Sequence, residues 1–166
     1  MNIWMKYGDE MYFTWKDYDP EKMQYVEKWL DKKAVRMTGM DDGWRNFYEY
    51  WANEEGFVVG ENYWCKVVFE DDKPFAIIAF CLYEGNITIM ETLVAPKMRG
   101  KGKGTKIIKE LLDNAKSIIG IDIYKAEAVI FLSNKASQKA FENAGFRYES
   151  IHEDGDAMNY VYEIKI

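Results

Sequence analysis

The stretch "APKMRGKGKGTK", residues 95–106, decides the fold of this chain because it joins a strand-like run to a helix-like one. It contains three glycines and five cationic side chains. The run before it, "NITIMETLVA", is typical of a strand, and the run after it, "TKIIKELLDNAKSIIG", has apolar residues at helical spacing and stops at Gly120. A glycine loop between a strand and a helix indicates an anion site, since backbone amides and the positive end of the helix dipole face the ligand.

The spacing of this loop excludes two nucleotide signatures. A P-loop for nucleoside triphosphates needs a Gly-Lys pair followed by Ser or Thr, and both Gly-Lys pairs here are followed by glycine. A dinucleotide fingerprint needs G-x-G-x-x-G in a parallel sheet, whereas this loop has G-x-G-x-G and follows a predicted antiparallel meander. The pattern that remains is Arg99-x-x-Gly102-x-Gly104.

The periodicity on both sides of the loop predicts the element order β, α, α, β, β, β, α, β, α, β, β. The predicted strands cover residues 11–15, 62–70, 74–84, 86–95, 126–132, 146–152 and 157–166, and the predicted helices cover residues 20–37, 41–56, 105–120 and 133–145. Asp41 or Asp42 is the expected cap of the second helix. A helix separates the strands at 86–95 and 126–132, so we expect these two to be parallel, with the second buried on both faces.

Composition indicates one ordered domain spanning residues 1–166, because this length buries a sizeable core and no repeat or linker interrupts it. A net charge of -6 argues against nucleic acid or an anionic membrane as partner. The chain begins with no signal-like pattern and has no apolar run of about 18 residues, so we expect a cytoplasmic protein. Cys65 and Cys81 are expected to be reduced and buried.

Two motifs in the chain resemble the GNAT superfamily of acetyl-CoA-dependent N-acetyltransferases. "LVAPKMRGKGKG", residues 93–104, matches the family signature [QR]-x-x-G-x-[GA], and "NKASQKAFENAGF", residues 134–146, is similar to its second block. The resemblance implies an α/β (α+β) fold with a mixed, mostly antiparallel central sheet of about seven strands, splayed at a central parallel pair, and helices on both faces. It also implies transfer of an acetyl group from acetyl-CoA to a primary amine, directly in a ternary complex and without a metal.

The resemblance also implies which residues hold the cofactor. The amides of four residues are expected to wrap the coenzyme A pyrophosphate: Gly100, Gly102, Gly104 and Thr105. Five cationic side chains would neutralise its phosphates: Lys97, Arg99, Lys101, Lys103 and Lys106. The amides of Thr92 and Val94 would meet the pantetheine arm, and Asn134 would either approach that arm or act only as a helix cap.

A candidate base follows from the need for a neutral acceptor amine, since an ammonium has no lone pair. Strand alternation predicts that Ile87, Ile89, Glu91 and Leu93 share one face, which makes Glu91 a carboxylate in an apolar row. Relatives often use an acidic residue at this point of the strand as base or to hold the amine. The alternative is a carboxylate paired with a neighbouring cation or tyrosine; Tyr83 and Glu84 are weaker candidates.

The general acid is left open by the sequence. Many relatives protonate the departing thiolate with a tyrosine of the second block, and the position that aligns here is Phe141, which has no proton to donate. Tyr148, Tyr124 or water would then serve, or the thiolate would leave unassisted. His152, the one histidine of the chain, is expected at the surface.

Relatives build much of the acceptor wall from the first two helices. These helices contain the acids Asp41, Asp42, Glu49, Glu54 and Glu55 among the aromatic residues Trp44, Tyr48, Tyr50 and Trp51. Carboxylates and aromatic faces suit a cation, so Asp41, Trp44 and Tyr48 are candidate contacts for a small basic or peptide amine. An amphipathic helix with its acids in water is the alternative. We expect a monomer or homodimer, and a non-catalytic acyl-CoA sensor or partner-binding domain is the competing function.

Overall fold

A single sheet of seven strands, in the order β1-β2-β3-β4-β5-β7-β6, forms the centre of the computed structural model, which describes residues 11–163. The strands are β1 (Thr14–Asp17), β2 (Tyr63–Glu70), β3 (Lys73–Tyr83), β4 (Asn86–Val94), β5 (Lys125–Phe131), β6 (Arg147–Ile151) and β7 (Ala157–Glu163). Only β4 and β5 are parallel, and every other neighbouring pair is antiparallel. The predicted fold class is confirmed. The end of the last predicted strand, residues 164–166, lies outside the described residues.

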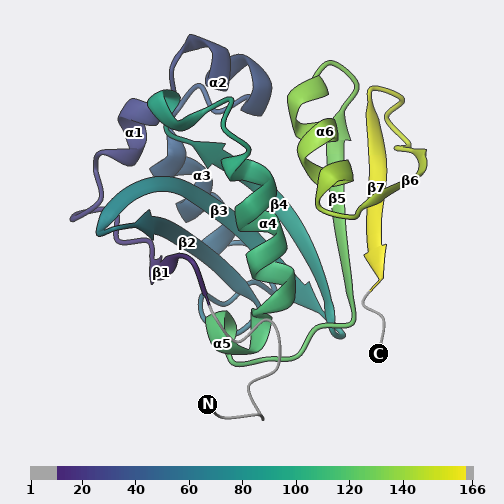
Figure 1. Cartoon of the computed structure of the whole chain (residues 1–166), viewed down its shortest axis with the longest axis horizontal. Coiled ribbons are helices and arrows are strands. Elements are labelled where there is room, and N and C mark those ends of the chain that lie inside the picture. Colours follow the sequence, from purple (N-terminus) through teal and green to yellow (C-terminus); the bar gives the residue numbers. More distant parts are fainter. Residues whose placement is uncertain (1–10, 164–166) are drawn as a thin grey trace.

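Helices cover both faces of the sheet (Figure 1). The helices are α1 (Val26–Trp29), α2 (Lys32–Thr38), α3 (Trp44–Ala52), α4 (Lys103–Asp113), α5 (Ala115–Ile119) and α6 (Lys135–Asn143), with a 3-10 turn, η1 (Pro96–Met98), after β4. One apolar core lies between the sheet and α4, α5 and α6 and includes Ile107 and Leu111. A second core lies between the sheet and α1, α2 and α3 and includes Val26 and Trp44.

Two predicted helices are each broken into a pair. The helix predicted over 20–37 ends at Trp29, and Leu30 leaves the helical region before Asp31 caps α2. The helix predicted over 105–120 is interrupted at Asn114, whose φ is -128°. Neither Asp41 nor Asp42 caps α3 by its side chain; a carboxylate of α1, Glu27, instead accepts the amide of Trp44 at 2.5 Å.

The parallel pair separates after a short stretch. Residues 86–89 of β4 pair with residues 125–128 of β5, and beyond them the two strands diverge (Figure 1). On the other side of β4, Ile89 pairs with Phe80 and Glu91 with Ala79, so Met90 is the extra residue of a β-bulge. The bulge and the splay therefore occur at the same point of β4.

The bulge reverses the faces of β4 and corrects the predicted alternation. Ile89 packs in the core beneath α4, whereas Leu93 packs in the core beneath α3. Glu91, two residues before Leu93, shares its face, because Cβ atoms alternate along a strand and its partner Ala79 belongs to the same core. Glu91 therefore lies on the α1–α3 side of the sheet, opposite to Ile87 and Ile89.

The prediction that the strand at 126–132 is buried on both faces is wrong. Burial alternates along β5, and Val129 and Phe131 are 49% and 47% exposed. Within the described chain, α1–α3 pack against the first four strands only, so this face of β5 has no helix over it. Cys65 and Cys81 are both free thiols; Cys65 is buried and Cys81 partly so. Among residues 11–163, no helix has the length and apolar character needed to cross a membrane.

Candidate functional site

The loop between β4 and α4 is built around two left-handed glycines. Gly100 and Gly102 both have φ of +74°, a conformation that costs a residue with a side chain free energy. A Cβ at either glycine would meet no protein atom within 4 Å, so both glycines border open space. At these two glycines the backbone of the loop is therefore not covered by side chains and is accessible to a ligand.

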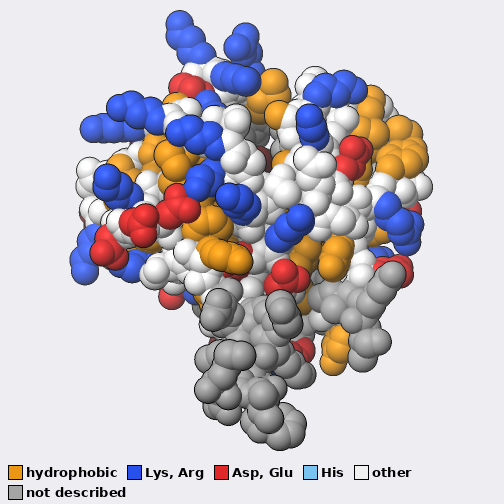
Figure 2. Space-filling model, viewed as in Figure 1, with side chains coloured by type: hydrophobic (Ala, Val, Ile, Leu, Met, Phe, Trp, Pro, Cys, Tyr) orange, Lys and Arg blue, Asp and Glu red, His pale blue; other side chains and the backbone are white. Residues whose placement is uncertain are grey.

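Several amides of this loop lack partners inside the protein. The first backbone bond of α4 is donated by Lys106 to the carbonyl of Gly102, at 3.2 Å. The amides of the three preceding residues therefore have no helical acceptor, and α4, 11 residues long, points its positive end at the same space. Three lysines at the loop are exposed: Lys97, Lys101 and Lys106. Figure 2 shows lysine and arginine side chains gathered over this part of the molecule, although the chain is acidic overall.

A cleft opens where β4 and β5 part. It is lined by Met37, Ile89, Met90, Glu91, Thr92, Ala128, Val129, Ile130, Phe131, Asn134, Ser137 and Phe141. Ala95 donates its amide to Phe75 of β3 at 2.7 Å, so alternate amides of β4, those of Leu93 and Glu91, also point toward β3. The amides of Thr92 and Val94 therefore point the other way, toward the cleft.

Glu91 occupies the bulged part of β4 in this cleft. Burial raises the pKa of its carboxyl to about 8, against a smaller lowering by the amide of Thr92. Among the described residues no lysine, arginine or histidine forms an ion pair with Glu91, so the alternative of a simple ion pair finds no support. The side-chain hydroxyl of the next residue, Thr92, is buried and has no hydrogen-bond partner in the described chain.

The second motif forms the other wall of the cleft. Asn134 accepts the amide of Ser137 at 3.1 Å and so caps α6, and it also lines the cleft. Its amide nitrogen donates no hydrogen bond within the described residues, which leaves it free for a ligand. Phe141 is buried against the ring of Phe146 at 4.9 Å and offers the cleft an apolar edge.

A protein-family model described as acetyltransferase (GNAT) family matches residues 64–146, which is half of the chain. The chain belongs to this GNAT acetyltransferase family. The predicted family and enzyme class, an acyltransferase, are therefore confirmed. No curated protein sequence matches the chain.

Solved structures of GNAT acetyltransferases share the fold. The aminoglycoside acetyltransferase AAC(6')-Ib in complex with coenzyme A has a TM-score of 0.70 at 18% identity, over 91% of this chain and 94% of that one. The spermidine N-acetyltransferase of Vibrio cholerae, in complex with coenzyme A and spermine, has a TM-score of 0.67 at 15% identity, over 92% and 95%. The N-acetyltransferase PseH of Campylobacter jejuni has 0.64 at 15% identity, over 93% and 100%.

The loop of this GNAT acetyltransferase fits the pyrophosphate of coenzyme A through its backbone. The positive-φ glycines, the amides without acceptors and the open space above them make a cradle for an anion. Gly104 contributes differently, because it already lies in the helix and a Cβ there would make only ordinary contact with Ala140 at 3.9 Å. Acetyl-CoA, the acyl donor of the family, thus has a matching site in this chain.

Two of the five cationic side chains predicted to neutralise phosphate are engaged elsewhere. The ammonium of Lys103 contacts both carboxylate oxygens of Glu70, at 2.7 and 2.9 Å, and lies over the rings of Phe13 and Phe75. The guanidinium of Arg99 contacts Asp31 and two backbone carbonyls. Both charges are already paired inside the protein, and a phosphate role of either side chain stays a prediction.

Tyr148 does not reach the cleft of this GNAT acetyltransferase. It lies on β6, the outermost strand, paired with Tyr160 of β7. Two strand spacings, about 10 Å in all, separate it from β5. The proposal of Tyr148 as general acid is therefore wrong. Tyr124 precedes β5 at the end opposite the splay and is 60% exposed, so it does not replace Tyr148.

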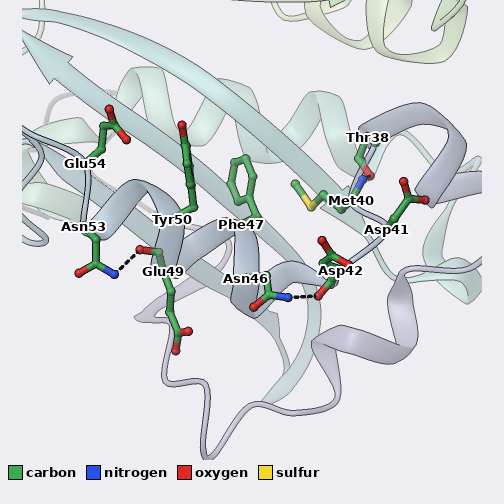
Figure 3. Close-up of a pocket in the computed structure, with 12 residues that line it drawn as sticks. Thr38, Met40, Asp41, Asp42, Asn46, Phe47, Glu49, Tyr50, Asn53 and Glu54 are labelled. Carbon is green, nitrogen blue, oxygen red and sulfur yellow. Dashed lines mark hydrogen bonds between the residues drawn. The ribbon is translucent and has the colours of Figure 1, made fainter.

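An acidic cavity of about 780 Å³ lies between the end of α2 and the length of α3 (Figure 3). Its lining includes Asp41, Asp42, Glu49, Glu54, Phe47 and Tyr50. Glu49 is paired with Arg45 at 2.8 Å, whereas Asp41, Asp42 and Glu54 form no ion pair within the described residues. Consecutive residues of α2, Met37 and Thr38, line the cleft and this cavity respectively.

Of the three acceptor contacts expected from the sequence, one lines the acidic cavity and two do not. Asp41 lines the acidic cavity. Trp44 is corrected: it is fully buried and donates its indole N–H to Cys65 Sγ at 3.1 Å, so no ligand reaches it. Tyr48 packs edge-on against Tyr18 at 5.1 Å and lies outside the cavity lining, so it supports the wall from behind.

Proposed function

We propose that this GNAT acetyltransferase transfers the acetyl group of acetyl-CoA to a primary amine of a small cationic acceptor, directly in a ternary complex. One observation carries the proposal: Glu91, at the bulge of β4, lines the cleft between β4 and β5 and forms no ion pair within the described residues, and Met37 of the same cleft is followed by Thr38 of the acidic cavity. Each part of the site answers one need of the reaction. A cytoplasmic location and a monomeric or homodimeric state stay predictions, as does a single domain over residues 1–166.

The backbone of the β4–α4 segment would hold the cofactor. The amides of Gly100, Lys101, Gly102, Gly104 and Thr105 would bind the pyrophosphate, and the exposed lysines would contribute charge. The amides toward the cleft, those of Thr92 and Val94, would bind the pantetheine arm as a strand partner would. The side chain of Asn134 would approach the same arm from α6.

Glu91 would take the proton of the acceptor amine, either directly or through a water molecule. With a pKa of about 8, its carboxylate is a stronger base than an ordinary glutamate and still ionises near neutral pH. The neutral amine forms a bond to the acetyl carbonyl carbon as the carbon–sulfur bond breaks, and the remaining extra proton of the nitrogen passes to the thiolate or to water. The thiolate leaves without a tyrosine donor, since Phe141 stands at that position and Tyr148 is distant.

The acceptor would carry at least one more positive group besides the amine that reacts. The acidic cavity lies next to the cleft along α2, and its aromatic residues Phe47 and Tyr50 suit contact with an ammonium group. Solved structures that share the fold include an aminoglycoside and a spermidine acetyltransferase. A polyamine or aminoglycoside is therefore the class of acceptor to test first.

The competing prediction from the sequence, a non-catalytic acyl-CoA sensor, rests on Phe141 alone and is at odds with the enzyme class of the family. Two measurements separate the candidates. Acetyl-CoA should raise the melting temperature, whereas DNA and RNA should not; indifference to acetyl-CoA would contradict both functions. Thiol release should then follow on addition of polyamines, aminoglycosides, amino acids or peptides. Binding of acetyl-CoA with no thiol release from any of these amines would favour the sensor.

Removing free carboxylates of the cavity should weaken the acceptor and spare the cofactor. We expect Asp41→Asn with Glu54→Gln to raise the KM of a cationic acceptor up to about tenfold, because each of the two ammonium–carboxylate contacts contributes up to about 1 kcal/mol. Glu55→Gln is the matched control, since Glu55 is exposed on the same segment but lies outside the cavity lining. Steady-state kinetics check the KM. If Glu55→Gln raised the KM equally, the acceptor would be attracted by the overall negative charge of the protein and not by the carboxylates of the cavity.

A further inference from the structure

Arg99 connects three segments that meet behind the cofactor loop. Its Nε donates to the carbonyl of Val94 at the end of β4, at 2.9 Å. One terminal nitrogen donates to the carbonyl of Trp29, the last residue of α1, at 2.9 Å, and the other donates to Asp31 Oδ2 at 2.8 Å. The planar guanidinium is thereby used as a fork, a geometry that lysine cannot reproduce.

Asp31 carries the connection into α2. Its Oδ1 accepts the amide of Ala34 at 2.9 Å and caps the helix, while its Oδ2 accepts Arg99. The capping bond and the charge of Arg99 both lower the pKa of this carboxyl. One carboxylate therefore fixes the first turn of α2 and ties that turn to the end of β4.

The rest of α2 is weakly anchored. Of its seven residues, only Ala34 is buried. Yet this helix supplies Met37 to the cleft and Thr38 to the acidic cavity, and the loop that follows it supplies Asp41 and Asp42. A helix with so little buried apolar surface depends on its polar contacts for its position. The position of the acceptor wall then depends on the contact between Arg99 and Asp31.

We propose that Arg99 is a positioning residue for the acceptor side of the site, which acts by holding α2 through Asp31, and that it is not a ligand of the cofactor phosphates. The charge of Arg99 is compensated by Asp31, and each of its nitrogens named above already has an acceptor within the protein. The signature arginine of the cofactor loop therefore sets the geometry in which the amine meets the cofactor. This inference rests on the proposed function.

Three variants test the inference. Asp31→Asn keeps a good helix cap and removes only the charge that binds Arg99; Arg99→Gln removes the fork, and Arg99→Lys keeps its charge without its geometry. We expect all three to raise the KM of the acceptor amine about tenfold, the cost of losing charge-assisted hydrogen bonds. The affinity for acetyl-CoA, measured by calorimetry, should change less than about threefold. The double variant Asp31→Asn/Arg99→Gln should be no worse than either single change.

Two results would overturn the inference. If Arg99→Gln weakens acetyl-CoA binding tenfold while Asp31→Asn does not, and Arg99→Lys restores it, Arg99 is a phosphate ligand. If the wild type turns over and none of the three variants has a changed KM for the amine, the contact between Arg99 and Asp31 has no role in the acceptor site.

Hydrogen exchange tests the contact between Arg99 and Asp31 without any enzymatic activity, so it still applies if the proposed function is wrong. Exchange at residues 32–38 should become faster in Asp31→Asn and Arg99→Gln, with little change at residues 103–113 of α4. Unchanged exchange in α2 would show that the helix does not depend on the contact between Arg99 and Asp31, whatever reaction the protein performs.

Discussion

Replacing Gly102 with valine should weaken acetyl-CoA binding by at least about 100-fold. A side chain here would fill the open space in which the pyrophosphate is expected, and it would move amides that each contribute about 1.5–3 kcal/mol to a charged ligand. Calorimetry with the wild type and the variant measures the change. No protein atom lies within 4 Å of the added Cβ, so the loss would come from the ligand site and not from a clash inside the fold.

The matched control for this variant is Gly120→Val. Gly120 ends α5, at the other end of the α4–α5 segment from the loop (Figure 1), and it has φ of +76° and nothing within 4 Å of a Cβ. Both variants carry the same backbone cost, of about 1–3 kcal/mol, and should lose melting temperature to a similar degree. Only Gly102→Val should lose acetyl-CoA. If it retains wild-type affinity, the cradle is not at this loop.

Replacing Glu91 with glutamine should lower turnover by about 100-fold or more at saturating substrates, the usual contribution of a general base. The affinity for acetyl-CoA should be unchanged, because in the proposed site backbone amides, and not this carboxyl, bind the cofactor. Glu127→Gln is the control, a carboxylate of neighbouring β5 that is paired with Lys125 at 3.0 Å and lies outside the cleft lining. A variant Glu91→Gln with wild-type turnover at every pH would remove Glu91 from the mechanism.

Because the pKa of Glu91 is raised, we also expect turnover to depend on pH. Turnover of the wild type should rise about tenfold per pH unit below about 8 and level off above it, as the carboxylate forms. The residual activity of Glu91→Gln should not show this rise with pH. A rate that is flat between pH 6 and about 9 in the wild type would mean that another group takes the proton.

Stability should depend on the same ionisation with a defined sign. The folded state holds the proton of Glu91 up to about pH 8, whereas an ordinary glutamate loses it near 4.5. Protonation therefore stabilises the fold fully below 4.5, and that contribution is lost as the pH rises through about 8. Glu91→Gln should match the wild type in melting temperature at pH 4 and exceed it at pH 9.

Much of the fold and the cofactor site could be predicted from local patterns. Alternation and helical spacing indicated all seven strands and their order along the chain, and the glycine loop was found from Arg99, Gly102 and Gly104 because that spacing depends on neighbouring residues alone. The second motif supplies three residues of the cleft lining: Asn134, Ser137 and Phe141. The family follows from these two motifs.

Local patterns failed where distant segments act on each other. The face of Glu91 depends on a bulge that forms only when β4 pairs with β3, and one extra residue reverses the side on which every later side chain lies. Trp44 seemed available to a ligand, yet it is buried by packing against β2. The break between α1 and α2 did have a local signal, an aspartate three residues before Ala34, which is typical of a helix cap.

The sequence by itself determined the order of the elements and the glycine loop, because conformational preference and periodicity are properties of neighbouring residues. Only the tertiary structure decided which charges of that loop remain free. Arg99 meets Asp31 across 68 residues of chain and Lys103 meets Glu70 across 33, and such pairs depend on how the sheet and helices pack. A loop that reads as five cations thus has two of them committed to holding the protein together, because the folded state pairs charges wherever packing brings them within a hydrogen bond.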